Sequence, residues 1–574
     1  MVMTTKSSAD EHVQNIEAVR RKVEHELKLN ISVAELSPLH QQRLLYIPRM
    51  PPLLRGAFRV AFGDRTSAAY DVEEIEKRFP KLFGQPVVKI VPNSGGPVTI
   101  GKKLRIGVVL SGGPAPGGHN VISGLFDHLQ ERNRDSELIG FVNGPSGIIE
   151  CNYSILTNEN IDPFRNQGGF HLLGSGRTKI ETEEQFAMAR EAAKKCELDG
   201  LVFVGGDDTN TNAMLLAEDF KAYNIDTKVI GVPKTIDGDL RNTYIETSFG
   251  FDTAVKVYSE LVANLGYDAS SAKKSYHFCR LMGRSASHIT LETALQTHPN
   301  MAVIGEEVEA NRQSLLSVVS DIADLVVERS KLGKDFGVII IPEGLVEFMP
   351  DMNKLISCLN DHLASNGSSS SDPADAVKML DNQERELFNS LPTDFQTQLL
   401  LDRDPHGNVR LSQTESERLL ITMTKSELKK RPDYKGKFSA IPHFFGYEGR
   451  CSLPTNFDCN YCYALGHTSA ALIEAGCTGY VATVSNLTTL PEQWECGGYP
   501  LTVMMNMERR KGKMVPVIKK ALISLEDPAF KIYAKQRAAW RLTEDYRCPG
   551  PIQHSGNMSE ELNFTLVANN EMSN

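Results

Sequence analysis

Three absences restrict what this protein can be: the sequence has no long hydrophobic run, no basic surplus and no apolar leader segment. No apolar stretch reaches the roughly 18 residues that a membrane-spanning helix needs. The 62 Lys and Arg residues are outnumbered by 72 Asp and Glu residues, so the net charge of -10 does not indicate a nucleic-acid partner. The N-terminus lacks an apolar segment followed by a small-residue cleavage site. We therefore expect a cytoplasmic protein with no membrane or nucleic-acid partner.

The sequence also lacks a complete cysteine-based metal motif. Ten cysteines among 574 residues are too few for a disulfide scaffold. Cys459 and Cys462 form a C-x-x-C with Cys451 nearby, but no second C-x-x-C or Cys/His pair completes four zinc ligands. Our interpretation is that these are reduced cysteines of a cytosolic protein.

The composition that is present, 41% hydrophobic and 23% charged residues, is that of a globular protein long enough for more than one core. Short apolar segments alternate with helical patterns, the clearest of which follow Asn120 and Asn210. Several of these segments are apolar on both faces, as in buried parallel strands. The alternation predicts an α/β fold with ligands at the carboxyl ends of the strands. The predicted strands are residues 105–110, 201–204, 229–232, 301–304, 336–341 and 480–484.

The first of three notable strand-to-helix junctions is rich in glycine. Residues 111–120 read Ser-Gly-Gly-Pro-Ala-Pro-Gly-Gly-His-Asn. Glycines let backbone N–H groups approach an anion closely at the start of a helix. The segment matches neither standard nucleotide fingerprint, so by itself it fits a ligand-free tight turn equally well.

The other two junctions supply carboxylates and a cation. Asp207 and Asp208 follow two glycines at the start of a helix, where capping needs only one such residue and magnesium favours carboxylate ligands. Lys234, Asp237 and Asp239 lie within six residues. Phosphoryl transfer needs such a set, with a carboxylate to accept a proton and positive charge facing the phosphoryl oxygens. A solvated turn rich in Asp and Gly is the simpler alternative for that segment.

Three weaker signals point to an anionic substrate. Arg284 and Arg450 can bind a phosphate as bidentate forks, and Glu343 can accept hydrogen bonds from sugar hydroxyls. Each residue taken singly fits an ordinary surface position equally well.

Taken in order, these motifs resemble the phosphofructokinase family. The matching elements are Gly-Gly-Pro-Ala-Pro-Gly-Gly-His-Asn, Gly-Gly-Asp-Asp-Thr-Asn-Thr-Asn, Pro-Lys-Thr-Ile-Asp-Gly-Asp, Met-Gly-Arg, Pro-Glu-Gly and Tyr-Glu-Gly-Arg. They cover roughly residues 100–345 and 441–540, and the similarity is greatest to the long, pyrophosphate-dependent branch. The resemblance implies a glycolytic, Mg²⁺-dependent kinase that reversibly phosphorylates fructose 6-phosphate from pyrophosphate and forms a homodimer or higher homo-oligomer.

The same resemblance implies two Rossmann-like, three-layer domains. Residues 101–250 plus about 452–505 would bind pyrophosphate and magnesium, and residues 251–451 plus about 506–545 would bind fructose 6-phosphate. An N-terminal extension (1–100, with a charged helix over about 10–29), a mostly helical insertion (350–440, entered through the serine run 368–371) and a C-terminal tail (546–574) complete the chain.

The resemblance also implies a role for each site residue. Asp237 would be the catalytic base, assisted by Asp239, and Asp207 would bind the metal. Asp208 and Lys234 would be catalytic residues at the binding site of the phosphoryl donor. Pyrophosphate would be bound by Gly112, Gly113, Arg177 and Lys234. Fructose 6-phosphate would be bound by Thr235, Ile236, Asp237, Met282, Gly283, Arg284, Glu343, Tyr447, Glu448, Gly449 and Arg450.

The donor prediction depends on two positions. ATP-using relatives have glycine where Asp208 stands, and a carboxylate there fills and repels the site of the α-phosphate. They also have glycine where Lys234 stands, whereas an ammonium can meet pyrophosphate directly.

One segment departs from the family pattern. Residues 272–278 resemble a segment that reaches the sugar phosphate across a subunit interface, but Ser275 replaces an aromatic residue. Whether Lys274, Ser275 or Tyr276 makes that contact stays open.

Two alternatives remain for the function. An ATP-dependent phosphofructokinase would share the fold, and a non-catalytic regulatory subunit would have lost part of the charged set, which is complete here. A dinucleotide-binding oxidoreductase is set aside because no G-x-G-x-x-G with a downstream acidic residue is present.

Overall fold

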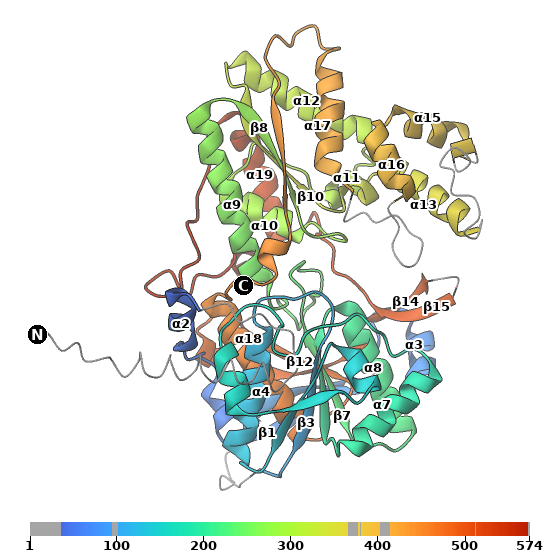
Figure 1. The fold of residues 1–574 in the computed structure, drawn as a ribbon, viewed down its shortest axis with the longest axis vertical. Helices are drawn as coiled ribbons and strands as arrows, with labels where there is room; N and C mark the ends of the chain where they lie inside the picture. Colours follow the sequence, from blue (N-terminus) through green and yellow to red (C-terminus); the bar gives the residue numbers. More distant parts are fainter. Residues whose placement is uncertain are drawn as a thin grey trace, which may run out of the picture.

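A computed structural model describes residues 36–93, 101–365, 377–378, 380–401, 414–510 and 513–571. The predicted helix over about 10–29 and the serine run 368–371 lie outside these ranges. The described residues form two main sheets, each covered by helices and lying one above the other in Figure 1. None of the described helices combines the length and the apolar character needed to cross a lipid bilayer.

The larger sheet has nine strands, and its centre is parallel. The order is β1-β2-β13-β12-β7-β6-β3-β4-β5, with antiparallel strands only toward its two edges. Residues 58–92 of the predicted N-terminal extension therefore widen this sheet. The strands are β1 (Phe58–Arg65), β2 (Pro86–Pro92), β3 (Arg105–Leu110), β4 (Glu137–Phe141), β5 (Tyr153–Leu156), β6 (Gly200–Gly205), β7 (Lys228–Pro233), β12 (Tyr480–Ser485) and β13 (Glu495–Pro500).

The central strands are buried on both faces because helices cover both. Successive side chains of a strand point to opposite faces. In β3, Val108 and Leu110 join the core beneath α4 and α18, whereas Val109 joins the core beneath α7 and α8. The helices around this sheet are α2 (Pro38–Leu44), α3 (Val72–Arg78), α4 (Gly118–Arg132), α5 (Pro145–Ile149), α6 (Asn158–Ile161), α7 (Glu183–Lys195), α8 (Asp207–Ala222) and α18 (Asn456–Glu474).

The smaller sheet is parallel throughout, in the order β11-β8-β10-β9. Its strands are β8 (Ser275–Leu281), β9 (Met301–Ala302), β10 (Phe336–Pro342) and β11 (Ala440–Phe445), and its surrounding helices include α9 (Phe251–Ala272), α10 (His288–Thr297), α11 (Gly305–Ala310), α12 (Leu315–Lys331) and α19 (Pro528–Leu542). The strand predicted over 301–304 is shorter, because β9 pairs only with β10 at the sheet edge and α11 begins at Gly305.

The insertion between β10 and β11 is mostly helical in its described parts, as expected. It contains α13 (Pro350–Ser365), α15 (Asn382–Ser390), α16 (Thr393–Leu401) and α17 (Ser416–Leu428), which share one apolar core with α12. Figure 1 shows these helices beside the smaller sheet, away from the larger one.

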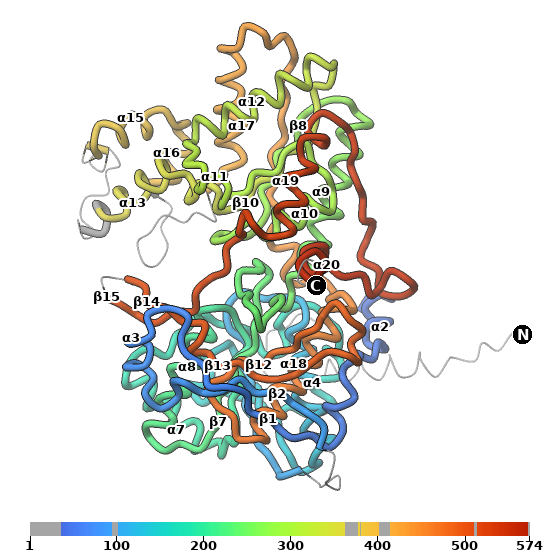
Figure 2. The backbone as a smooth tube through the Cα atoms, turned by 180° about the vertical axis from the view of Figure 1, so that it is seen from behind, coloured from blue at the N-terminus to red at the C-terminus, as the bar shows by residue number. Residues whose placement is uncertain are grey.

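The C-terminal part of the chain runs from one sheet to the other. The hairpin of β14 (Met505–Arg510) and β15 (Lys513–Ile518) packs on α8 and α3, so residues just after 505 lie with the larger sheet. The chain then crosses to α19 beside the smaller sheet and later forms α20 (Phe564–Glu571), a path that Figure 2 shows in orange and red. The crossing segment, residues 518–527, passes the loops of both sheets. The predicted domain boundaries stay predictions.

Candidate active site

The three sequence junctions meet at one edge of the larger sheet. They follow β3, β6 and β7, which are neighbouring parallel strands, so their carboxyl ends lie side by side. Two backbone hydrogen bonds continue the pairing into the loops: Ser111 N–H donates to Val204 O (2.9 Å) and Lys234 N–H donates to Gly205 O (3.0 Å). The topology therefore brings the glycine-rich loop, the start of α8 and the 233–240 loop together.

Lys234 faces the glycine-rich loop. Its Nζ donates to the carbonyl oxygen of Gly113 (2.8 Å) and would lie 3.2 Å from a Cβ placed on Gly112, whose φ is +82°. The side chain is almost fully buried, and burial lowers the pKa of Lys234 to about 8, although the nearby Asp237 carboxylate opposes this shift. A buried ammonium held against backbone in this way is a strong attractor for a compact anion.

Two arginines come to the same loop from different parts of the chain. A Cβ placed on Gly113 would lie 3.4 Å from Arg450 Cζ, so the loop after β11 reaches the glycine turn. The Gly112 N–H donates to Gly176 O (3.0 Å), which brings the loop containing the exposed Arg177 alongside. Both arginines help to lower the pKa of Lys234, as nearby positive charges do.

Asp207 and Asp208 begin α8, where the helix dipole favours negative charge. Burial raises the pKa of Asp207, and the charges of Asp208 and Asp239 add to the effect. Asp208 is half exposed and its Oδ1 lies 3.2 Å from Lys179 Nζ, on the loop that also carries Arg177. The two neighbouring carboxylates therefore face different surroundings: Asp207 lies inward among charged groups, and Asp208 lies on the rim.

Asp237 has the features of a general base. Burial raises its pKa to about 7, with further upward contributions from Asp239 and Glu343, while Lys520 and Arg284 oppose the shift. Its backbone N–H donates to Thr235 Oγ1 (3.0 Å), which holds the turn. A carboxyl group with a pKa near neutrality can accept a proton during a reaction and release it afterwards.

The smaller sheet contributes residues that face this group. Glu343 follows β10 and is buried, and burial raises its pKa. Its Oε2 accepts from the N–H of Gly283 (3.2 Å), a residue with φ of +123°, so the turn after β8 is held by the loop after β10. Glu343 and Arg284 both act on the pKa of Asp237, so these smaller-sheet residues lie close to that carboxyl group.

The loop after β11 presents an arginine and an aromatic ring. Arg450 Cζ lies 4.8 Å from the ring centre of Tyr447, which is 67% exposed. Glu448 is turned toward its own loop, where Oε2 accepts from Gly446 N–H (2.7 Å). Gly449 packs against the Tyr258 hydroxyl, so that position admits no side chain. Met282 is buried next to the end of β11, where its N–H donates to Phe445 O (3.0 Å), and Ile236 is buried in the loop after β7.

Of the three residues with an open role at a subunit interface, only Lys274 is exposed. Ser275 Oγ lies 3.1 Å from Ser439 Oγ, and the residue is 8% exposed. Tyr276 is fully buried, and its hydroxyl donates to Lys334 O (3.2 Å). The side chains of Ser275 and Tyr276 are therefore occupied inside this chain.

Sequence reasoning missed Lys520. Its Nζ lies 2.8 Å from Ser285 Oγ, 3.8 Å from Asp239 Oδ2 and 3.9 Å from Asp207 Oδ2. It is carried by the segment that crosses between the two sheets, far along the chain from every motif. The only local signal is a pair of lysines after an apolar strand.

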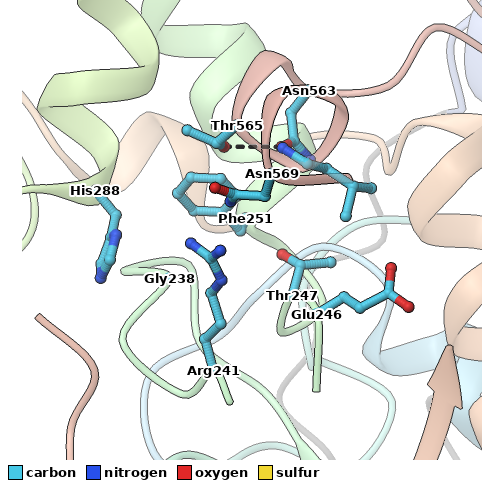
Figure 3. Close-up of a pocket in the computed structure, with 10 residues that line it drawn as sticks. Gly238, Arg241, Glu246, Thr247, Phe251, His288, Asn563, Thr565 and Asn569 are labelled. Atoms are coloured by element: carbon cyan, nitrogen blue, oxygen red, sulfur yellow. Dashed lines mark hydrogen bonds between the residues drawn. The ribbon is translucent and has the colours of Figure 1, made fainter. Parts of the chain in front are cut away.

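A small pocket beside the 233–240 loop is lined by Gly238, Arg241, His288 and residues of α20. Figure 3 shows the Arg241 guanidinium directed toward Phe251 and α20, and the Glu246 carboxylate turned away from it. Gly238 has φ of +75°, and a Cβ there would lie 3.0 Å from the Phe251 ring. Asp207, Asp237 and Asp239 do not line this pocket.

The described residues contain no group of three or more His, Cys, Asp and Glu side chains arranged to hold a metal ion. Asp207 and Asp239 nevertheless approach the same ammonium group. One or two carboxylates fit a magnesium ion that takes its other ligands from water and substrate phosphates. Cys459 and Cys462 are buried in α18 as free cysteines, and burial raises the pKa of Cys459 to about 12.

Parallel α/β layers whose strand ends bring together a glycine turn, a buried cation and buried carboxylates are the arrangement expected of an enzyme that acts on phosphate compounds. Residues 105–381 match the phosphofructokinase family, and the chain belongs to that family. It is 53% identical over 526 residues to the pyrophosphate–fructose 6-phosphate 1-phosphotransferase subunit beta 1 of Arabidopsis thaliana, covering 90% of this chain and 92% of that protein.

One further relative and one solved structure are also similar to this chain. The pyrophosphate–fructose 6-phosphate 1-phosphotransferase of Porphyromonas gingivalis is 50% identical, covering 91% of this chain and 96% of the relative. The crystal structure of the pyrophosphate-dependent phosphofructokinase from Nitrosospira multiformis matches with a TM-score of 0.52 at 15% identity, covering 77% of this chain and 93% of that one. The structural match confirms the predicted fold class.

Proposed function

We propose that this protein is a pyrophosphate-dependent phosphotransferase that converts fructose 6-phosphate and pyrophosphate to fructose 1,6-bisphosphate and phosphate, in both directions. The relatives that carry this activity in their names resemble the chain over about nine-tenths of its length. The observation that carries the donor assignment is the buried Lys234 ammonium held 2.8 Å from the glycine-rich loop. An ammonium at this position can meet pyrophosphate directly.

The donor site combines attraction and exclusion. Lys234 and Arg177 place positive charge beside Gly112 and Gly113, where a pyrophosphate would bind through backbone N–H groups. Asp208 adds a carboxylate at the start of α8, where it repels a third phosphate. This pairing supports pyrophosphate over ATP.

The reaction needs a divalent metal, which we assign as Mg²⁺. Asp207 would hold it, because this carboxylate lies inward at the end of β6 next to the proposed donor site. When bound, the ion would neutralise charge on the phosphate oxygens. The chain itself keeps the Asp207 carboxylate in place. It also supplies cationic side chains around the same phosphate oxygens.

The acceptor side centres on Asp237. Its raised pKa suits a base that takes the proton from the 1-hydroxyl of the sugar phosphate. Thr235, which braces the turn, and Asp239 would orient the hydroxyl and the transferring group. In the reverse direction the protonated carboxyl returns the proton, so one residue serves both directions.

Fructose 6-phosphate would be held by the smaller-sheet residues. Arg284 and Arg450 would bind its phosphate, and Glu343 would accept from sugar hydroxyls. Tyr447 would cover the sugar with its exposed ring. Main-chain and apolar contacts would come from Ile236, Met282, Gly283, Glu448 and Gly449.

The names of plant relatives as subunits indicate oligomeric assembly, and we propose that this chain forms a homo-oligomer. Lys274 is then the residue that reaches a neighbouring subunit's substrate, because Ser275 and Tyr276 are occupied internally. A regulatory subunit without activity is disfavoured because Asp207, Asp237 and Lys234 are all present.

An initial-rate comparison of the two donors tests the proposal. Purified protein with fructose 6-phosphate and Mg²⁺ should turn over with pyrophosphate and barely with ATP. ATP turnover at an equal rate would overturn the donor assignment, and the absence of turnover with either donor would overturn the enzymatic function.

A further inference from the structure

We propose that Lys520 is an additional catalytic residue, which contacts the phosphoryl group during its transfer between pyrophosphate and the sugar. This inference rests on the function proposed above. None of the sequence motifs includes Lys520, and it comes from neither the donor loops nor the acceptor loops.

The first observation is its position between the two halves of the site. On one side its Nζ lies 3.9 Å from Asp207 Oδ2 and 3.8 Å from Asp239 Oδ2. On the other side it lies 2.8 Å from Ser285 Oγ, directly after the proposed phosphate ligand Arg284. A phosphoryl group that moves from donor to acceptor must cross the space between these groups, where the ammonium already sits.

The second observation is that its backbone is held from both sides. Before it, the Lys519 N–H donates to Met504 O (3.0 Å) beside the larger sheet. After it, the Ala521 N–H donates to Asp239 O (2.7 Å), and the Ala521 carbonyl lies 2.9 Å from His288 Nε2 of α10. The position of the lysine is therefore fixed by a segment that is hydrogen-bonded to the 233–240 loop and to a helix of the smaller sheet. Such preorganisation lets a charge stabilise a transition state without a large reorganisation cost.

The third observation is accessibility. The Lys520 side chain is 36% exposed, so a substrate oxygen can reach it. The ammonium can exchange its long contacts with the two carboxylates for a direct contact with a phosphoryl oxygen.

The transfer forms one bond to phosphorus and breaks one. The sugar 1-hydroxyl oxygen forms the new bond to phosphorus, its proton passes to Asp237, and the bridging oxygen leaves with the second phosphate. Lys520 donates hydrogen bonds to the oxygens of the moving group and exchanges no proton. Its removal should weaken binding of the transition state more than binding of either substrate.

The neighbouring lysine supplies a matched control. Lys519 points the other way, with its Nζ 3.7 Å from the ring centre of Tyr70 at the surface. Lys520→Met and Lys519→Met remove the same charge from adjacent positions in the same backbone. Any loss caused by net charge or by disturbance of the crossing segment should appear in both variants.

The experiment measures kcat and KM of both variants with pyrophosphate, and follows thermal unfolding of each. We expect Lys520→Met to lower kcat by roughly 10²–10³-fold, the usual effect of deleting one transition-state donor, with KM for fructose 6-phosphate changed less than about threefold and unfolding unchanged. Lys519→Met should keep wild-type rates, and Lys520→Arg should recover part of the lost kcat. A Lys520→Met enzyme within about threefold of wild-type kcat, or an equal loss in Lys519→Met, would overturn the proposal. An inactive wild-type protein would instead refute the underlying function.

Discussion

The Nζ atom of Lys234 lies 2.8 Å from the carbonyl oxygen of Gly113, joining the loop after β7 to the loop after β3. This contact fills the space beside the glycine turn with a positive charge. A buried cation at such a turn is complementary to a small polyanion, as the proposed pyrophosphate donor is.

The donor preference can be tested by emptying that space. The double variant Asp208→Gly with Lys234→Gly removes the rim carboxylate and the buried ammonium together. Pyrophosphate turnover should fall by about 10²-fold or more, the order expected when a preorganised donor is lost, while turnover with ATP rises above the wild-type level. Parallel initial-rate assays with the two donors measure the change. A variant that only loses activity shows that this explanation of donor choice is incomplete.

The role of Asp237 can be tested by removing its charge while keeping its shape. Asp237→Asn should lower kcat by about 10²–10⁴-fold, because general-base catalysis contributes on that order. Binding of fructose 6-phosphate, followed by calorimetry, should stay close to wild type. Asp226→Asn changes a carboxylate that is 98% exposed and serves as the control. Wild-type turnover in the Asp237 variant would reject the assigned base.

The dependence of kcat/KM on pH should be bell-shaped and narrow. The Asp237 pKa of about 7 means that the base becomes protonated as the pH falls below that value, so the rate drops on the acid side. The Lys234 pKa of about 8 means that the ammonium is lost as the pH rises, so the rate drops on the alkaline side as well. The residual activity of Lys234→Met should lack the alkaline limb. An unchanged alkaline limb in that variant would assign the limb to pyrophosphate ionisation instead.

The raised pKa of Asp237 also has a consequence for stability. Its pKa is about 7 in the folded protein against an ordinary value of 3.8, so the folded state binds this proton more tightly than the unfolded chain. The stabilisation from this group is complete below about pH 4 and is lost as the pH rises through about 7. Asp237→Asn should therefore unfold at a higher temperature than wild type at pH 8. The difference should shrink toward pH 5, and a constant difference would contradict the raised pKa.

A contact across subunits can be tested by mixing inactive variants. Lys274→Met alters the residue that we propose reaches a neighbouring subunit, and Asp237→Asn alters the site within its own subunit. If Lys274 acts on the neighbouring site, co-refolded mixtures of the two should regain activity, because hybrid oligomers contain sites with both groups intact. A mixture of Asp237→Asn with Lys234→Met should stay inactive, since both changes fall in one subunit's site. Failure of the first mixture to recover would place Lys274 outside the site or within its own subunit.

Much of the α/β framework follows from local sequence. The apolar segments at 105–110, 201–204 and 229–232 become β3, β6 and β7 within one residue at each end. Such strands are buried on both faces, so their hydrophobicity is continuous and their ends are marked by glycine, aspartate or proline. No strand was predicted toward one edge of the larger sheet. There, β1, β2 and β13 pair antiparallel across long stretches of chain, and no local sequence pattern indicates which strand is the partner.

The amino-acid sequence by itself determined which side chains are available for chemistry. Asp207, Lys234 and Asp237 follow three buried strands, and parallel strands bring their carboxyl ends to one edge. The tertiary structure decided that Arg450 reaches the glycine turn, that Tyr276 is buried, and that Lys520 stands between Asp207, Asp239 and Ser285. Those contacts depend on how the two sheets and the crossing segment pack against each other. Long-range packing of this kind leaves no periodicity in the chain, so it can be found only in the folded protein.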